Sequence, residues 1–201
     1  GAYAPAPLVD EVQLKEIKKT ILEPTLEALN NRGIDYRGVI YAGLMLTESG
    51  PKVIEFNCRF GDPECQTLMP LLGPELAQVL HACAIGDLAH APKLSIHDSC
   101  SVCIVAAASG YPERPRKGDS VKIKPMKEKQ IQLFHAGTDR NPEGEVITSG
   151  GRVLSIVAQG RTFDEAFSIA YKGLKNVDFK DMQYRFDIGH QVRNMDNPKG
   201  T

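Results

Sequence analysis

Residues 53–64 read VIEFNCRFGDPE, and this run constrains the fold of the chain more than any other stretch. Its first half is rich in β-branched and aromatic residues and alternates apolar with polar positions, which predicts a strand with one polar face. Glu55 and Asn57 should leave that strand on one face, and Ile54 and Phe56 on the other. Residues on the same face lie roughly 6.6 Å apart along a strand, so a carboxylate and an amide oxygen can converge on one hard cation.

Arg59 follows two residues later and can reach the same region from the end of the strand. A carboxylate, a neutral oxygen and a planar guanidinium suit a magnesium-bound phosphate group, because the metal and the guanidinium both neutralise phosphate charge. The alternative is a strand end whose polar residues are only solvated. Two alternating oxygen ligands do not decide between these interpretations.

The overall composition is that of a globular protein, with 42% hydrophobic and 24% charged residues over 201 positions. The net charge of −1 gives no basic field for nucleic acid and no polybasic segment for a membrane, which favours a small molecule or another protein as partner. No apolar run reaches the roughly 20 residues of a membrane helix. Five cysteines is an odd number for a disulfide framework, so we expect reduced thiols, structural rather than metal-binding cysteines at Cys100 and Cys103, and a cytoplasmic location.

The first part of the chain predicts a helix after a proline-rich opening, residues 1–7, that has no secondary structure of its own. Apolar residues at three- and four-residue steps predict this helix over residues 9–31. Asp10 is its predicted N-cap, and Pro24 should kink the helix or split it in two.

A hairpin should follow this helix. Residues 36–47 are apolar on both faces, which predicts a central strand of a covered sheet. A turn at residues 47–51 then joins this strand to the polar strand as an antiparallel pair. Gly43 allows a close approach of ligand or backbone. Beyond the hairpin, Asp62 is the predicted N-cap of a helix that begins at Pro63, and a second helix is predicted over residues 74–84.

The chain becomes rich in strands after a predicted boundary near residue 91. We expect strands over residues 101–108, 121–123, 130–135, 146–148 and 153–159. A helix over residues 163–176 follows, with Thr162 and Glu165 as a capping box. Ser149-Gly150-Gly151 is a candidate phosphate cradle, but no helix follows it at once, which favours a plain hairpin turn. The predicted domains are residues 1–91 and 92–192, with a tail or linker over 193–201.

Several of these stretches together resemble the glycinamide ribonucleotide synthetase family, the ATP-grasp ligases of purine biosynthesis. The resemblance rests on GAY and PAP within residues 1–7, YAGLM at 41–45, EFNCRFGDPE at 55–64, HAGT at 135–138, GGRVL at 150–154 and DIG at 187–189. They occur in the family's order over nearly the whole chain, and the run at 55–64 is the most specific. Cys58 and Cys65 resemble the animal form, in which the synthetase is the first portion of a trifunctional polypeptide.

The resemblance implies an α+β fold: a second ATP-grasp half, with an antiparallel sheet and helices, followed by a small strand-rich α+β C-terminal domain. The family joins 5-phosphoribosylamine and glycine using ATP, through glycyl phosphate, and releases ADP and phosphate. The positions that match Glu55 and Asn57 bind a divalent metal, Mg²⁺ or Mn²⁺. Arg59 matches a basic position near the transferred phosphoryl group and is the expected catalytic residue. No general base is needed, because the glycine carboxylate is already ionised near neutral pH.

The sequence lacks two parts that the family's proteins have. The family's N-terminal domain and the ATP-grasp half that holds adenine are not found in the sequence, so we expect the remainder of the same polypeptide to supply them. Alone, the chain should have little or no ligase activity. Two alternatives remain: another ATP-grasp purine-pathway ligase or carboxylase, which would share the metal strand but not residues 59–64, and a noncatalytic interaction fragment, which would tolerate loss of Glu55.

Overall fold

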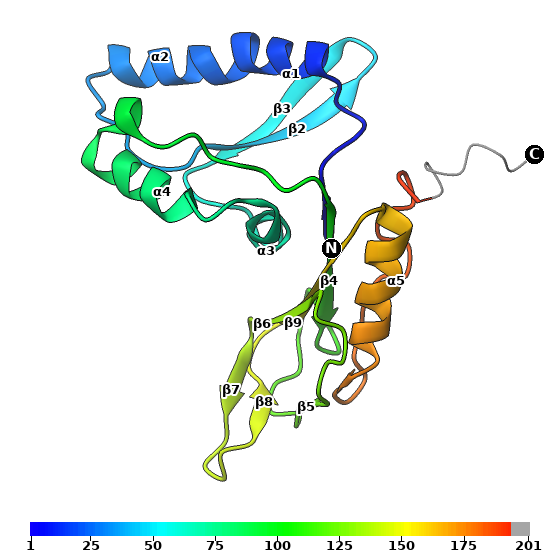
Figure 1. The fold of residues 1–201 in the computed structure, drawn as a ribbon. Helices are drawn as coiled ribbons and strands as arrows, with labels where there is room; N and C mark the ends of the chain where they lie inside the picture. Colours follow the sequence, from blue (N-terminus) through cyan, green and yellow to red (C-terminus); the bar gives the residue numbers. More distant parts are fainter. Residues whose placement is uncertain (194–201) are drawn as a thin grey trace, which may run out of the picture. The chain divides into compact units, whose positions relative to one another are not determined.

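The computed structural model describes residues 1–193, so the predicted tail after residue 193 lies outside the described residues. Contacts divide the chain into two compact units, both discontinuous in sequence (Figure 1). The hairpin unit consists of Ala6–Asp62 and Leu72–Ile96, and the sheet unit consists of Gly1–Pro5, Pro63–Leu71 and residues 97–193 of the described chain. The sequence predicted a single boundary near residue 91, whereas each of these units combines separate segments of the chain. The predicted domains, residues 1–91 and 92–192, stay a prediction.

The hairpin unit begins with a helical run that confirms most of the predicted long helix. This run consists of α1 (Glu11–Ile17), a π-helical turn η1 (Lys18–Leu22) and α2 (Glu23–Asn31). Asp10 is the N-cap, as predicted, and exchanges hydrogen bonds with Gln13 in a capping box. The predicted break occurs in the turn before Pro24, because a proline has no N–H to donate to the carbonyl one turn back.

The predicted antiparallel hairpin is confirmed as β2 (Tyr41–Thr47) paired with β3 (Gly50–Asn57). The prediction that β2 is a central strand is wrong, since within residues 1–193 it pairs with β3 alone. Met45 is 55% exposed and Leu46 40% exposed. The apolar pattern predicted burial on both faces, but a face is buried only where another element packs on the sheet, and this end of β2 stays exposed in the described chain. Helix α4 (Leu76–Ile85) and the 3₁₀ turn η3 (Leu88–His90) complete the unit.

The sheet unit is built on a four-stranded antiparallel sheet in the order β1-β4-β9-β6. These strands are β1 (Ala2–Ala4), β4 (Cys100–Ala107), β9 (Arg152–Gly160) and β6 (Ile131–His135). The predicted antiparallel α+β unit is therefore confirmed. The proline-rich opening was wrongly predicted to lack secondary structure, because a three-residue edge strand is too short to produce a periodic pattern.

The remaining elements of the sheet unit cover this sheet or extend from it. They are α3 (Glu64–Leu68), the 3₁₀ turn η2 (Met69–Leu71), the pair β7 (Thr138–Arg140) and β8 (Val146–Thr148), the pair β5 (Lys122–Ile123) and β10 (Val177–Asp178), and α5 (Phe163–Leu174). The prediction that Asp62 caps a helix beginning at Pro63 is wrong. Pro63 is itself the N-cap, with a φ of −98° and a ψ of 19°, and no side chain caps α3.

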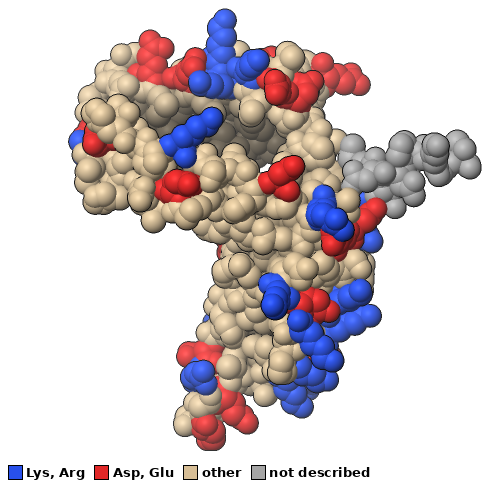
Figure 2. Space-filling view, in the orientation of Figure 1, with Lys and Arg blue, Asp and Glu red and all other residues tan. Residues whose placement is uncertain are grey.

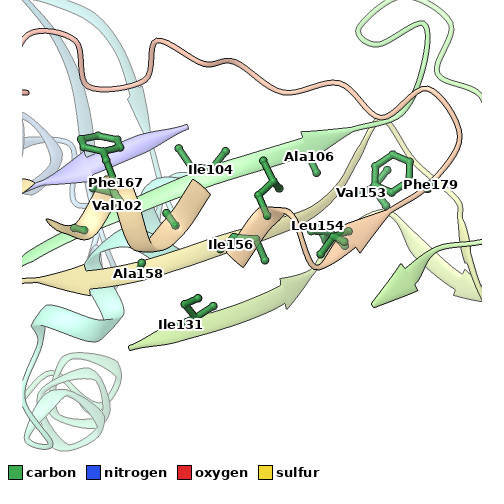
Figure 3. Close-up of a cluster of buried hydrophobic side chains, with 14 of the residues drawn as sticks. Val102, Ile104, Ala106, Ile131, Val153, Leu154, Ile156, Ala158, Phe167 and Phe179 are labelled. Carbon is green, nitrogen blue, oxygen red and sulfur yellow. The ribbon is translucent and has the colours of Figure 1, made fainter. Parts of the chain in front are cut away.

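The core of the sheet unit lies between the sheet and α5 (Figure 3). Strands β4 and β9 are mostly apolar, as expected for central strands, and they contribute Val102, Ile104, Leu154 and Ile156. Phe167 of α5 packs against them and is fully buried. The Thr162 hydroxyl caps α5 by accepting a hydrogen bond from the Glu165 backbone N–H at 3.2 Å, which confirms the predicted N-terminus. The predicted capping box is only half made, because the Glu165 carboxylate accepts a hydrogen bond from the Arg161 backbone N–H at 2.8 Å rather than from that of Thr162. Cys103 is buried, and all five cysteines are free thiols.

In the described part of the chain, every helix is too short or too polar to cross a membrane.

Candidate functional site

Strand β3 carries the predicted metal ligands. Glu55 pairs with Gly43 of β2, and Asn57 pairs with Tyr41, so the two residues are alternate positions of one ladder and their side chains leave the same face. Glu55 is exposed and Asn57 is half-buried. The structure therefore supplies two oxygen donors on one face of the hairpin.

On the other face of β3, the side chains do not follow the simple alternation that the sequence predicted. Gly43 pairs with Glu55 but the next residue, Leu44, pairs with Val53, so that Ile54 forms a β-bulge. Val53 and Phe56 line a groove with residues of α2, whereas Ile54 is 63% exposed. The prediction that Ile54 and Phe56 share the apolar face is thus wrong for Ile54, because a bulge adds one residue and shifts the alternation behind it.

Gly43 leaves room for the Glu55 side chain. A Cβ atom at position 43 would lie 3.1 Å from Glu55 Cγ, which is closer than ordinary van der Waals contact. The close approach predicted for Gly43 is therefore made by the side chain of its cross-strand neighbour, and an alanine at this position would require Glu55 Cγ to shift by a few tenths of an ångström.

Arg59 lies in the exposed turn after β3, where its Nη1 donates a hydrogen bond to the Phe60 carbonyl at 2.9 Å. The guanidinium thus bonds locally, and its grouping with Glu55 and Asn57 stays a prediction. Residues 1–193 contain no cluster of three or more His, Cys, Asp or Glu side chains that could hold a metal. A metal on β3 would depend on one carboxylate and one amide, as is usual for Mg²⁺, which keeps waters and substrate phosphates as its other ligands.

The sheet unit contains a cavity of about 490 Å³ that the sequence patterns did not reveal. Its lining includes two arginines, Arg152 at the start of β9 and Arg185 in the segment after β10, together with the rings of Tyr111 and Tyr184. Both arginines lie in or beside stretches that carry the family resemblance, yet no local periodicity connects them. The sequence marked Arg152 only as part of the GGRVL stretch at 150–154, without any sign that it lines a cavity.

Arg185 is held in place by its neighbours. Its Nε and Nη2 donate to the two carboxylate oxygens of Asp187 at 2.8 and 2.6 Å, and its backbone carbonyl accepts a hydrogen bond from the Tyr171 hydroxyl at 2.9 Å. The hydrogen bonds from Arg185 lower the pKa of Asp187 to about 2. At neutral pH the two groups therefore form an ion pair that fixes the guanidinium.

The turn before Arg152 is not a phosphate cradle. The backbone N–H groups of Ser149 and Gly150 both donate to the Gly137 carbonyl, at 2.8 and 3.2 Å, so these donors are already used. This agrees with the plain turn that the sequence favoured. Figure 2 shows acidic and basic side chains intermixed over the exposed surface of the α1–α2 run.

Two domains of one synthetase match this chain in order. Residues 1–65 match "Phosphoribosylglycinamide synthetase, ATP-grasp (A) domain", and residues 101–191 match "Phosphoribosylglycinamide synthetase, C domain". The first match contains Glu55, Asn57 and Arg59, and the second contains Arg152 and Arg185.

Individual relatives agree with these matches. The chain is 47% identical to a phosphoribosylamine–glycine ligase from Synechocystis over 194 residues, which are 96% of this chain and 46% of that protein. It is 44% identical to the trifunctional purine biosynthetic protein adenosine-3 of Gallus gallus over 193 residues, 96% of this chain and 19% of that protein. The relatives thus include separate and fused forms, and the chain spans about half the length of the separate ligases.

Solved structures give the same result. A phosphoribosylamine–glycine ligase from Thermotoga maritima superposes with a TM-score of 0.79 at 30% identity, over 92% of this chain and 45% of that one. A biotin carboxylase from Campylobacter jejuni superposes with a TM-score of 0.60 at 14% identity, over 90% of this chain and 39% of that one. The second likeness concerns the fold alone, and both agree with an α+β part of an ATP-grasp fold.

Proposed function

The chain belongs to the phosphoribosylglycinamide synthetase family, and we propose on that basis that it forms part of an ATP-grasp ligase joining 5-phosphoribosylamine to glycine. The observation that carries the proposal is the order of the two family domains along the chain, with Glu55 and Asn57 on one face of β3 inside the first. In the proposed reaction the glycine carboxylate attacks the γ-phosphorus of ATP, and ADP leaves. The amine then attacks the carbonyl carbon of glycyl phosphate, and inorganic phosphate leaves.

The donors on β3 fit a divalent metal. Glu55 and Asn57 would hold Mg²⁺ or Mn²⁺ through a carboxylate and an amide oxygen, both of which are ligands that hard cations prefer. When bound, the metal supplies neutralisation of phosphate charge. The chain itself keeps the Glu55 side chain in position, because Gly43 leaves the space that this side chain occupies.

Arg59 is the proposed catalytic residue. It follows the ligand strand at an exposed turn, and its hydrogen bond to the Phe60 carbonyl uses only Nη1. A guanidinium that approaches the transferred phosphoryl group would stabilise the charge on its oxygens. Rate enhancement would then come chiefly from positioning and from charge neutralisation, without a general base.

The same proposal includes the substrates, the protein partners and the cellular location. ATP, glycine and 5-phosphoribosylamine are the small-molecule partners, and the family's N-terminal domain and adenine-holding half are the protein partners. The free cysteines suit a reducing compartment, which supports a cytoplasmic location.

The experiment compares two glutamates of the same hairpin in a full-length family polypeptide that carries this sequence. Glu55→Gln removes the charged ligand, whereas Glu48→Gln changes an exposed glutamate in the β2–β3 turn and is the matched control. ADP release is measured with 5-phosphoribosylamine, glycine and ATP over a range of Mg²⁺ and Mn²⁺ concentrations. We expect Glu55→Gln to lose most activity and its metal dependence, and Glu48→Gln to keep both.

The same assay separates the alternatives. A noncatalytic interaction fragment would tolerate Glu55→Gln, so unchanged turnover would refute the metal assignment. A carboxylase would consume bicarbonate in place of glycine, and glycine-independent ADP release would favour it. The isolated chain should show little or no ligase activity, and turnover close to that of the full-length polypeptide would contradict this expectation.

A further inference from the structure

Two of the five free cysteines, Cys58 and Cys83, belong to the hairpin unit. Cys58 is exposed in the turn after β3, and Cys83 is half-buried in the last turn of α4. The other three cysteines belong to the sheet unit. Neither Cys58 nor Cys83 has a role in the proposed reaction, so the surroundings of the two thiols decide what they can do.

Helix α4 holds Cys83 against the segment that leads into β2. The Cys83 thiol donates a hydrogen bond to the Gly38 carbonyl, with 3.8 Å between sulfur and oxygen. Cys83, Gly38 and Tyr36 line one cavity of about 270 Å³. A Cβ atom at Gly38 would lie 3.6 Å from the Tyr36 hydroxyl oxygen. The thiol of Cys83 and the hydroxyl of Tyr36 therefore both lie beside Gly38.

The β2–β3 ladder brings Cys58 to the same segment. The ladder ends with the pair of Tyr41 and Asn57, so the residue after Asn57 in this antiparallel hairpin continues toward the residues just before β2. The Tyr36 hydroxyl agrees with this placement. Desolvation raises its pKa, and a hydrogen bond with the Cys58 thiol and electrostatic interactions with Cys58 and Cys83 raise this pKa further. Both thiols thus act on one hydroxyl group.

The two cysteines differ in their freedom to move. Cys83 is part of a helix and is hydrogen-bonded to Gly38, whereas Cys58 follows the last residue of β3 and lies in a turn. A disulfide needs roughly 2.05 Å between the two sulfurs and a Cα separation of roughly 4.4–6.8 Å. The movement that joins the thiols therefore falls on Cys58. The Tyr36 hydroxyl, which also donates a hydrogen bond to the Val39 carbonyl at 2.7 Å, keeps the mobile thiol near its partner.

We propose that Cys58 and Cys83 are a site of oxidative modification, where a peroxide converts the two thiols to a disulfide that ties the end of β3 to α4. Cys58 Sγ attacks one peroxide oxygen, the O–O bond breaks, and a sulfenic acid and one water form. Cys83 Sγ then attacks Cys58 Sγ, the S–O bond breaks, and a second water leaves. The two sulfurs are oxidised, the peroxide is reduced, and both thiol protons end in the waters. Excess thiol reverses the step, as expected for a transient disulfide in a reducing compartment.

The disulfide has a consequence for the strand that carries the proposed metal ligands. Asn57 directly precedes Cys58, so a movement of Cys58 toward α4 pulls on the end of β3 and displaces the Asn57 amide. The oxidised chain should therefore bind Mn²⁺ more weakly than the reduced chain. This consequence rests on the proposed function, whereas the disulfide itself does not.

The direct test treats the reduced 201-residue chain with hydrogen peroxide under native conditions. Intact mass should fall by two hydrogen atoms, and protease digestion should give one linked peptide pair that contains Cys58 and Cys83. Dithiothreitol should restore the original mass. Cys58→Ser and Cys83→Ser should each abolish the link. Cys65→Ser is the matched control, because Cys65 is half-buried like Cys83 but lies in the sheet unit, and this variant should form the link as before.

A further variant tests the role of the tyrosine. Tyr36→Phe keeps the ring and removes the hydroxyl that holds Cys58, so it should slow disulfide formation roughly two- to tenfold, which is the effect of one lost hydrogen bond of ordinary strength. Several results would overturn the proposal: an unchanged mass, oxygen added to Cys58 while Cys83 stays a free thiol, a link between two chains, or a link among the sheet-unit cysteines that persists in Cys58→Ser. Peptide mapping of the unchanged chain decides this even where a serine variant does not fold.

Manganese binding separates failure of this proposal from failure of the proposed function. Mn²⁺ is titrated into the oxidised chain and into the same sample after reduction with dithiothreitol and removal of the reductant. Equal affinity of the two forms refutes the effect of the disulfide on β3. Absence of Mn²⁺ binding to the reduced chain refutes the placement of the metal on β3, and the mass and peptide map then decide the thiol pair by themselves.

Discussion

Gly189 connects the packing of the sheet unit to the segment that carries Arg185, and its replacement by alanine gives a quantitative test. Its φ is +72°, in the left-handed region, and its backbone lies against the core. A Cβ atom at this position would lie 2.1 Å from Cζ of Phe167, which is fully buried. Gly189→Ala therefore combines two penalties: an unfavourable backbone conformation, and an overlap with a ring that has no free space to move into.

The magnitude follows from adding these two effects. The left-handed conformation costs an alanine roughly 1–2 kcal/mol relative to glycine. Overpacking of a filled core costs roughly 1–3 kcal/mol more. We therefore expect Gly189→Ala to lower the free energy of unfolding of the sheet unit by about 2–5 kcal/mol.

Gly118→Ala is the matched control in the same unit. Its φ is +86°, and a Cβ atom there would have no atom within 4 Å, so that it carries the backbone penalty of roughly 1–2 kcal/mol alone. Urea unfolding can be followed by near-ultraviolet circular dichroism of the tyrosines, since the chain has no tryptophan. Equal destabilisation by the two variants would refute the argument that Gly189 is required by its contact with Phe167.

Three further predictions concern single contacts. Arg185 holds the pKa of Asp187 at about 2, below its usual 3.8. The ion pair should therefore stabilise the chain above about pH 4 and lose this effect as the pH falls toward 2. Thermal melts of Asp187→Asn and of the unchanged chain should differ near pH 6 and converge near pH 2. Thr162→Ala removes the α5 cap and should lower the free energy of unfolding by about 1 kcal/mol in urea, whereas Thr162→Ser should restore most of it. Glu55→Gln should abolish most Mn²⁺ binding to the chain, measured by paramagnetic broadening of NMR signals, whereas Gly43→Ala should weaken it only slightly, because the new Cβ shifts Glu55 Cγ by a few tenths of an ångström; unchanged broadening in Glu55→Gln would contradict the placement of the metal on β3.

The elements that the sequence predicted well are those whose signal is local and repeated. Strands β4 and β9 are long apolar runs, and α5 combines a helical apolar period with a capping residue at Thr162. Each pattern extends over enough residues that one exceptional residue does not hide it. The antiparallel pairing of β2 with β3 was predictable for a similar reason, because a short turn between two strands leaves few other arrangements.

The errors have the opposite character, since each depends on a single residue or on a distant partner. The edge strand Ala2–Ala4 is defined by its pairing with Ser101–Cys103, nearly a hundred positions later, and not by any periodicity of its own. The bulge at Ile54 comes from one extra residue in β3, which alternation cannot detect. The exposure of Met45 reflects what packs on the faces of the hairpin, and the hydrophobicity of the strand itself does not contain that information.

The same distinction explains why one candidate site was visible in the sequence and the other was not. Glu55 and Asn57 are two positions apart on one strand, so strand geometry alone places their oxygens on one face. Arg152 and Arg185 instead come from the start of β9 and from a segment beyond α5, and they share a cavity only because Gln183 pairs with Ala107 and Tyr171 holds the Arg185 carbonyl. The two donors on β3 are therefore visible in the sequence as a local pattern, whereas the arginine-lined cavity forms only when segments far apart in the sequence come together in the sheet unit.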